Sequence, residues 1–159
     1  MRRATTALCV LWLAAVFPAA AAAEKPIIVP NPPFPDTVLE GVCEFPVLIE
    51  ELDAKSKSII FSDRILTTGK IKARLTNLDT GESVDVNISG PGTFRFDEEN
   101  GTLTIVGGGP WLHFLTESDA GGPGLFFTRG RFTLVIGPDG SVLAFDPGRN
   151  VTDMCAVLA

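Results

Sequence analysis

The side chains that could carry out chemistry are few in this sequence. Its 159 residues include one His, three Cys and no Tyr. The single imidazole belongs to His113, in the apolar run Trp111-Leu-His-Phe-Leu. A hydrolytic triad needs a His beside a nucleophilic Ser and an orienting carboxylate, and no Gly-x-Ser-x-Gly turn presents such a Ser. One His also cannot build a His-rich zinc site. We therefore expect His113 to be a packed or hydrogen-bonded strand residue, with a polar contact inside a ligand cavity as the alternative.

Charged residues supply the remaining candidates. Residues 97–99 are acidic and precede Asn100-Gly101. Carboxylate oxygens suit Ca²⁺, but the alternating spacing of a calcium loop is missing, so a solvated hairpin tip is the simpler interpretation. Arg129 and Arg131 flank Gly130 and form either a solvated stripe or an anion site. No catalytic residue, metal or cofactor is predicted. The candidate ligand-binding residues are His113, Trp111, Arg129 and Arg131.

Composition limits the class of protein and of partner. Hydrophobic residues make up 45% of the chain, too many for a disordered protein, and the length fits one domain. The 13 Lys and Arg residues against 19 Asp and Glu give a net charge of −6 and a sequence pI of about 4.7. Nucleic-acid binding depends on a dense positive surface that releases counterions, so no nucleic-acid partner is expected.

The first 23 residues have the pattern of a secretory signal peptide. Basic residues 2–3 precede the apolar run 7–17, and small residues then lead to a cleavage site after Ala23. The apolar run is much shorter than the roughly 20 residues of a membrane-spanning helix. We therefore expect a secreted, extracellular protein with no stable membrane span once the signal peptide 1–23 is removed.

Two segments follow the signal peptide. Residues 24–41 contain five prolines, which favour an extended polyproline-like chain, and we expect a stiff linker there. Residues 42–159 are expected to form a single domain. Its cysteines, Cys43 and Cys155, are an even pair in an oxidising compartment, with no Cys-x-x-Cys motif or local cationic cluster to activate a thiol. A structural disulfide is therefore preferred over a pair of reactive thiols.

Apolar and polar residues alternate through most of the domain, as in strands with one buried face. Ile71, Ala73 and Leu75, for example, alternate with basic or polar neighbours, and turns such as Asn100-Gly101 separate the runs. We expect an all-β fold, an antiparallel meander of eight or nine strands forming a small barrel or, alternatively, a two-sheet β-sandwich. A short C-terminal helix capped by Thr152 is also expected. The expected strands are 43–52, 57–67, 70–78, 82–89, 92–97, 102–107, 110–116, 124–137 and 141–146.

Five stretches of the domain carry a resemblance to a known kind of protein. They are Gly41-Val-Cys-Glu-Phe-Pro-Val, Val86-Asn-Ile-Ser-Gly-Pro-Gly, Gly109-Pro-Trp-Leu, Gly124-Leu-Phe-Phe-Thr-Arg-Gly-Arg and Val151-Thr-Asp-Met-Cys-Ala. Together they resemble an uncharacterised family of small secreted proteins from high-GC Gram-positive bacteria. The resemblance implies a bacterial source but no known function, and it transfers no catalytic or binding residue. The Asn-x-Ser/Thr triplets at Asn87, Asn100 and Asn150 are accordingly not interpreted as glycosylation sites.

Three classes of function remain compatible with the sequence. The first is a non-catalytic binding protein with a small apolar or amphiphilic ligand inside the barrel. The second is a structural or protein-interaction module with a cell-envelope or protein partner. The third, a small barrel enzyme such as an isomerase or cyclase, is less favoured because the acid or base would have to be His113 or a buried carboxylate. An apolar cavity would support the first class, and a buried carboxylate with a raised pKa would support the third.

Overall fold

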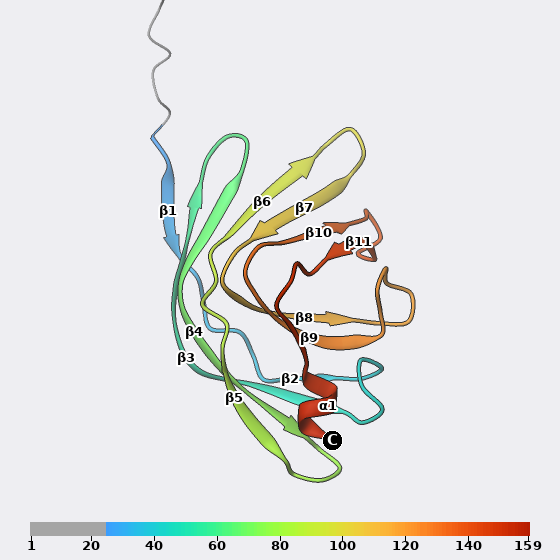
Figure 1. Cartoon of the computed structure of the whole chain (residues 1–159). Helices are drawn as coiled ribbons and strands as arrows, with labels where there is room; N and C mark the ends of the chain where they lie inside the picture. Colours follow the sequence, from blue (N-terminus) through green and yellow to red (C-terminus); the bar gives the residue numbers. More distant parts are fainter. Residues whose placement is uncertain (1–24) are drawn as a thin grey trace, which may run out of the picture.

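The computed structural model describes residues 25–159, which form two antiparallel β-sheets and one short helix, α1 (Met154–Leu158) (Figure 1). The predicted all-β class with a short C-terminal helix is confirmed. The predicted signal peptide lies outside the described residues. Within 25–159 no helix is long and apolar enough to cross a bilayer. The strands are β1 (Ile27–Pro30), β2 (Thr37–Leu39), β3 (Val47–Ile60), β4 (Ile65–Asn77), β5 (Ser83–Asn87), β6 (Gly92–Asp97), β7 (Thr102–Gly107), β8 (Pro110–Leu115), β9 (Gly124–Arg129), β10 (Phe132–Ile136), β11 (Val142–Asp146) and β12 (Val151–Asp153).

The larger sheet follows the order β1-β3-β4-β6-β7-β10-β11, with β2 added to β3 and β5 added to β4. The smaller sheet has the order β12-β9-β8. In Figure 1 the β3–β4 ribbon curves along one side of the molecule, and the β8–β9 hairpin and α1 lie toward its concave side. Among the described residues no pairing joins β1 to β11, so the larger sheet stays open and the closed barrel is not confirmed.

The long β3–β4 hairpin differs from the predicted boundaries, which placed separate strands at 57–67 and 70–78. The chain turns at 61–64 instead, where Phe61 N donates to Arg64 O (2.9 Å). Gly69, which falls between the two predicted strands, is paired with Ser56 inside β4 at a φ of 138°. A Cβ at Gly69 would overlap the backbone of residues 55–56, so glycine allows close strand contact here rather than a turn.

A second boundary lies at Gly130, inside the predicted strand 124–137. Gly130 has a φ of 125°, which side chains disfavour, and it separates β9 from β10. Because β9 belongs to the smaller sheet and β10 to the larger one, the chain changes sheets at this residue. The β8–β9 hairpin therefore leaves the sequential meander, and β7 pairs directly with β10.

The proline-rich segment, expected to be a linker, lies along the edge of β3. β1 pairs with residues 57–60 of β3, and β2 pairs with residues 47–49. Between them, Asn31 is hydrogen bonded to Ser56 and Ser58, and Phe34 N donates to Glu51 Oε2 (3.0 Å). Proline is tolerated on an edge strand because its missing N–H can face away from the ladder. The sheet therefore begins within the segment that was expected to precede the domain.

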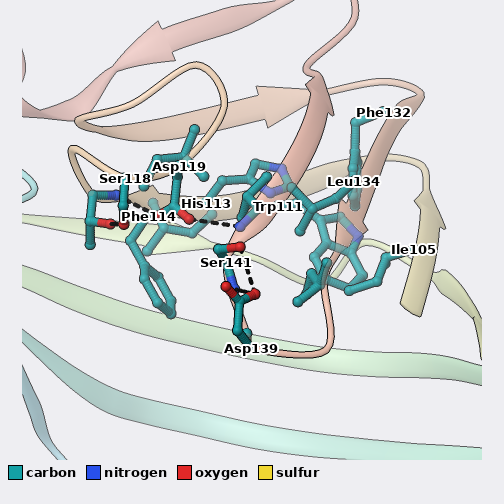
Figure 2. A pocket seen from close by; sticks show the side chains of 16 residues that line it. Ile105, Trp111, His113, Phe114, Ser118, Asp119, Phe132, Leu134, Asp139 and Ser141 are labelled. Atoms are coloured by element: carbon teal, nitrogen blue, oxygen red, sulfur yellow. Dashed lines mark hydrogen bonds between the residues drawn. The ribbon is translucent and has the colours of Figure 1, made fainter. Parts of the chain in front are cut away.

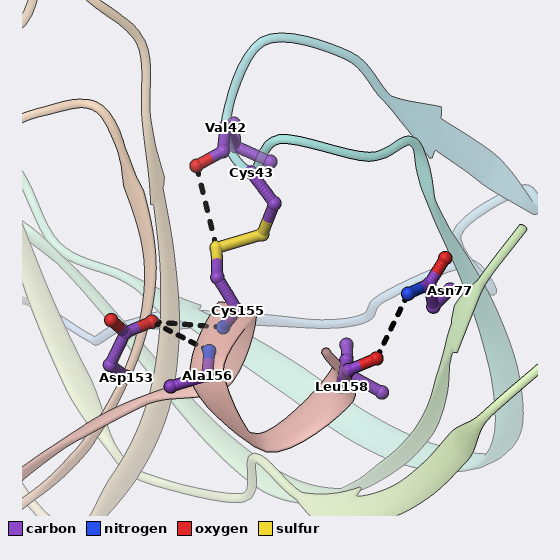
Figure 3. Close-up of a disulfide and its surroundings, with 7 residues drawn as sticks. All are labelled: Val42, Cys43, Asn77, Asp153, Cys155, Ala156 and Leu158. Atoms are coloured by element: carbon purple, nitrogen blue, oxygen red, sulfur yellow. Dashed lines mark hydrogen bonds between the residues drawn. A yellow bond between two sulfur atoms is a disulfide. The ribbon is translucent and has the colours of Figure 1, made fainter. Parts of the chain in front are cut away.

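The disulfide joins the Cys43 loop to α1, as predicted (Figure 3). The two Cα atoms lie 5.5 Å apart. Asp153 caps α1 by accepting from the backbone N–H groups of residues 155 and 156, whereas the predicted cap, Thr152, is paired within β12. Asn77 Nδ2 donates to Leu158 O (2.9 Å) at the other end of the helix. A disulfide of this kind is consistent with an extracellular protein.

Packing of α1 completes a core between the two sheets. The buried members of this core come from β3, β4, β5, β9 and α1, and the helix contributes Met154 and Leu158. Burying such side chains gives the main favourable contribution to folding. The core residues are Val47, Ile49, Ala73, Leu75, Val86, Leu125, Phe127, Met154 and Leu158.

Candidate functional site

A second apolar region contains an open cavity of about 580 Å³ (Figure 2). It lies between β7, β8, β10 and β11, away from the disulfide. Aromatic and aliphatic side chains form most of its wall, and a few polar residues come from the turns that follow β8 and β10. The lining residues are Ile105, Trp111, Leu112, His113, Phe114, Leu115, Thr116, Ser118, Asp119, Phe132, Leu134, Ile136, Asp139, Gly140, Ser141 and Val142.

Strand alternation accounts for much of this wall. Successive side chains of a strand point to opposite faces, so Phe132, Leu134 and Ile136 share one face of β10. Leu134 is paired with Ile105 of β7, which extends the same apolar face to the neighbouring strand. Across the cavity, Trp111, His113 and Leu115 of β8 share a face in the same way. The wall thus combines residues from both sheets.

Aromatic rings pack at one end of the cavity. The Phe132 ring lies 5.0 Å from the Trp111 ring and 4.4 Å from the His113 ring, measured between centroids. Such tilted and edge-to-face geometries are favourable for aromatic pairs. Phe132 lies against Gly107, its partner on β7, and a Cβ at Gly107 would overlap the ring. The close approach of ring and backbone therefore requires glycine at that position.

His113 is both packed and hydrogen bonded. The residue is 5% exposed, and its Nε2 lies 3.0 Å from Thr128 Oγ1 on β9. Desolvation by burial lowers the pKa of His113 to about 4, so the imidazole is neutral at pH 7. Its ring centroid also lies 5.0 Å from that of Phe145 on β11. His113 therefore presents an uncharged, mostly apolar surface to the cavity.

Trp111 contributes a ring face to the cavity and holds its own donor away from water. Its Nε1 is buried without a hydrogen-bond partner in the described structure, close to the backbone of Gly90. A small recess of about 170 Å³ adjoins Trp111 on that side and includes the polar residues Asn31, Ser56 and Ser89. An unpaired buried donor costs roughly 1–3 kcal/mol. The indole ring of Trp111 is therefore packed closely against Gly90, and its N–H is left without a hydrogen bond.

Two carboxylates stand at the rim of the cavity. Asp119 accepts from Val142 N (2.7 Å) and from Thr116 N (2.7 Å), and these bonds lower the pKa of its carboxyl group. Asp139 accepts from the hydroxyl (2.7 Å) and N–H (3.1 Å) of Ser141, which lowers its pKa in the same way. Both groups are ionised at neutral pH.

The rim carboxylates do not have the property that the enzyme hypothesis needs. A small isomerase or cyclase working through a carboxylic acid would need a buried carboxyl group with a raised pKa. Among residues 25–159, five carboxyl groups have a pKa displaced from the ordinary value, and in all five the pKa is lowered and the residue is not buried; they are Asp53, Asp85, Asp97, Asp119 and Asp139. The two rim carboxyl groups, Asp119 and Asp139, therefore do not supply the raised pKa that this hypothesis predicts.

The structure separates the four predicted ligand-binding residues into two places. Trp111 and His113 line the apolar cavity, whereas Arg129 and Arg131 line a different recess of about 370 Å³. That recess also contains Arg149, which the sequence analysis did not single out because it stands alone in a loop. Arg149 reaches the recess because the loop after β11 contacts β9, where Arg129 N donates to Asn150 O (2.8 Å).

The acidic residues 97–99 form the hairpin tip that was expected. Asp97 Oδ1 accepts from the backbone N–H of Glu99 (3.0 Å) and its Oδ2 from the side chain of Asn100 (2.8 Å), bonds typical of a tight turn. Across residues 25–159 no group of three or more His, Cys, Asp or Glu side chains is arranged to hold a metal ion.

Comparison with protein-family models, with curated proteins and with solved structures gives no match. The interpretation of the cavity therefore depends on its own geometry and chemistry.

Proposed function

We propose that the protein binds a small apolar or amphiphilic ligand in the cavity beside Trp111 and His113, without catalysis. The observation that carries this proposal is the cavity itself, about 580 Å³ in volume with walls that are mainly aromatic and aliphatic. Ligand sites are typically concave, roughly 300–1,000 Å³ in size and apolar, with a small number of polar groups that orient the ligand. The turns after β8 and β10 supply such polar groups at one side.

The charges around the cavity favour one kind of ligand. The imidazole of His113 is neutral, and the carboxylates of Asp119 and Asp139 at the rim are negative at neutral pH. An anionic head group would be repelled by these carboxylates, whereas a hydroxyl or ammonium group would not. The proposed ligand therefore has an apolar body with a neutral or cationic polar end.

The proposed binding site lies in an incomplete barrel of a secreted protein. The curved larger sheet and the β8–β9 hairpin act together as an incomplete barrel around the ligand, open at the rim that carries Asp119 and Asp139. The chain is exported, the signal peptide 1–23 is removed, and binding takes place outside the cell. The disulfide between Cys43 and Cys155 supports this setting, because such bonds persist in oxidising compartments.

Tryptophan fluorescence provides a direct test. The sequence contains two Trp and no Tyr, so the full chain carrying Trp12→Phe has Trp111 as its single tryptophan reporter. Titration with 1-decanol or decylamine, below the concentration at which either aggregates, should change the Trp111 emission in a saturable manner. Decanoate, which has the same chain length and an anionic end, should bind more weakly.

A pair of variants connects the signal to the cavity. Leu134→Phe adds volume to a lining residue and should weaken decanol binding at least tenfold. Val135→Phe makes a similar change at the next residue, which does not line the cavity, and should bind decanol like the parent chain. Thermal melts would verify that both variants fold. Absence of saturable binding, or equal binding by the two variants, would refute the proposal.

A further inference from the structure

The free edge of β5 is a second candidate site, separate from the apolar cavity. Just after β5, Ile88 N donates to Ile71 O of β4 (2.9 Å). The backbone groups of an antiparallel strand alternate between its two sides, so residues 83, 85 and 87 point away from β4. In the described part of the chain no other strand pairs with β5, which leaves the N–H and C=O groups of these residues open to a partner.

The two end strands of the larger sheet are protected in ways that β5 is not. Asn31 N donates to β3 (3.0 Å), so the same alternation directs Pro26 and Pro30 away from β3. Proline has no N–H to donate, so these positions cannot continue the sheet. On β11, the N–H and C=O of Val142 are already bonded to residues 119–120. β5 contains no proline, and such protection is the usual means by which proteins prevent pairing at an exposed edge.

The edge of β5 borders a groove of about 500 Å³. The wall opposite β5 comes from the smaller sheet and α1, and it includes the apolar residues Phe127, Met154 and Val157. Val157 is 51% exposed. The groove therefore has unpaired backbone groups on one side and apolar side chains on the other. Its lining residues are Val84, Asp85, Val86, Asn87, Gly109, Pro110, Phe127, Arg129, Thr152, Met154 and Val157, none of which lines the apolar cavity.

We propose that this groove binds an extended peptide segment of another protein, which adds a strand to the edge of β5. In strand addition, main-chain hydrogen bonds provide affinity, and contacts of alternate side chains provide specificity. β5 has five residues, so it pairs with a segment of similar length. Alternate side chains of the added strand then point into the groove, against its apolar wall.

α1 lies beside the first residues of β5. Asn77 N donates to Glu82 O (2.9 Å), directly before β5, and Asn77 Nδ2 donates to Leu158 O (2.9 Å) in the helix. Val157 precedes Leu158 and lines the groove at this end. We expect an apolar side chain of the peptide here, because it would remove the exposed surface of Val157 from water.

Arg129 lies beside the other end of β5. Gly90, which follows β5, donates its N–H to Pro110 O (2.9 Å), and Pro110 is paired with Arg129. The guanidinium group of Arg129 lies over the Phe127 ring, 5.2 Å from its centroid. The carboxylate of Asp85, which also lines the groove, is ion-paired with an arginine of β4 (2.7 Å). We therefore expect an acidic side chain of the peptide beside Arg129.

A second copy of the chain fits this edge less well than a different protein. Antiparallel pairing of two β5 strands about Asp85 would place the two Asp85 residues opposite each other, and like charges in that arrangement are destabilising. Each chain also has a net charge of −6, so two copies repel each other. The proposed partner is therefore a different polypeptide.

Peptide selection on the full chain tests the proposal. A phage-displayed library of random heptapeptides is selected on the parent chain, and synthetic copies of the enriched peptides are titrated by calorimetry. Asp85→Pro removes an outward N–H and leaves the hydrogen bonds between β5 and β4 in place, so it should weaken peptide binding at least tenfold. Asp85→Asn is the matched control, because it also loses the ion pair but keeps the N–H. Asp85→Asn should bind like the parent chain.

Two further substitutions test the ends of the groove. Val157→Ser should weaken peptide binding by about fivefold, whereas Val38→Ser, at an exposed valine of β2 outside the groove, should have no effect. Arg129→Gln should weaken the binding of enriched peptides that contain an acidic residue by about fivefold. Leu134→Phe, in the apolar cavity, should leave peptide binding unchanged, so the two proposals can fail separately.

Hydrogen exchange measured by NMR locates the bound peptide without any substitution. In the free chain the N–H groups of Val84 and Val86 should exchange slowly, because they are bonded to β4, and those of Asp85 and Asn87 should exchange fast. A bound peptide should slow exchange at Asp85 and Asn87 at least tenfold. This measurement decides the proposal even if Asp85→Pro does not fold.

The outcomes separate strand addition from other kinds of binding. Weaker binding by a folded Asp85→Pro, together with slowed exchange at Asp85 and Asn87, supports the proposal. Absence of enriched peptides on the parent chain, equal binding by Asp85→Pro, or unchanged exchange at Asp85 and Asn87 overturns it. A dimeric parent chain with a monomeric Asp85→Pro variant would assign the edge to a second copy, and this result would also overturn the proposal.

Discussion

Gly107→Ala should destabilise the protein although it adds only one methyl group. The new Cβ would overlap the Phe132 ring, which is 1% exposed and held between Trp111 and His113 at centroid distances of 5.0 and 4.4 Å. Overpacking of this kind costs about 1–3 kcal/mol. Replacing Gly by Ala in a compatible backbone gains about 0.4–1 kcal/mol by restricting the unfolded chain. We expect a net loss of about 1–2 kcal/mol.

The neighbouring residue provides the control. A Cβ at Gly108 would meet no atom within 4 Å, so Gly108→Ala should be neutral or slightly stabilising. Urea unfolding with the disulfide intact measures both variants. In a Phe132→Leu background the overlap is largely removed, and the cost of Gly107→Ala should fall by about 1–3 kcal/mol, the coupling energy of a double-mutant cycle. If Gly107→Ala were as harmless as Gly108→Ala, the packing of Phe132 on β7 would be wrong.

Two further predictions concern the buried imidazole and the faces of β4. Burial lowers the pKa of His113 from 6.5 to about 4 in the folded protein. As the pH falls, the imidazole is therefore protonated in the unfolded state before it is protonated in the folded state. The free energy of unfolding should accordingly fall by about 2–3 kcal/mol between pH 6.5 and pH 4. Urea melts between pH 6.5 and pH 4 should show that the free energy of unfolding depends less on pH in His113→Gln than in the parent chain. An equal pH dependence in the two proteins would contradict the lowered pKa of His113. Leu75→Asp should unfold the domain because Leu75 is 0% exposed, whereas Lys72→Gln on the opposite, solvated face should change the free energy of unfolding by no more than about 0.5 kcal/mol. Equal losses in those two variants would refute the two-faced strand.

Local pattern predicts the faces of strands better than their partners. The alternation around Ile71, Ala73 and Leu75 indicates which side chains of β4 face inward, and Ala73 and Leu75 are both 0% exposed. The same reasoning applies to residues 132–136, whose apolar members line the cavity. Alternation follows from the geometry of each strand, so a single sequence contains it.

Strand boundaries and pairings were harder to predict because glycine has several structural roles. Gly69 continues a strand and Gly130 ends one, yet both adopt positive φ values. The turn at 61–64 contains no glycine at all. The pairing of β7 with β10 skips the whole β8–β9 hairpin, and nothing local to either strand specifies it. Such non-local contacts are decided by packing of the complete chain.

Only some residues of the candidate sites could be predicted, because the others are brought together by non-local contacts. Trp111 and His113 were found because aromatic and imidazole groups are rare and stand together on one strand. Asp119 and Arg149 were missed because each lies in a loop, and only the folded chain brings them to a rim or a recess. Arg129 and Arg131 were ligand-binding candidates as an anion site, and both line a recess apart from the cavity of Trp111 and His113.

The attachment of α1 to the early part of the chain has a consequence for synthesis. Asn77 contacts Leu158 across 81 positions, and Cys43 is bonded to Cys155 across 112. While a ribosome is still translating the segment between them, β3 and β4 lack the helix side chains that cover their apolar face. The apolar face of β3 and β4 therefore stays uncovered, or is shielded by other factors, until α1 has been made. Such delayed completion is compatible with the export proposed above, because a chain that has not completed its core can still cross a membrane unfolded.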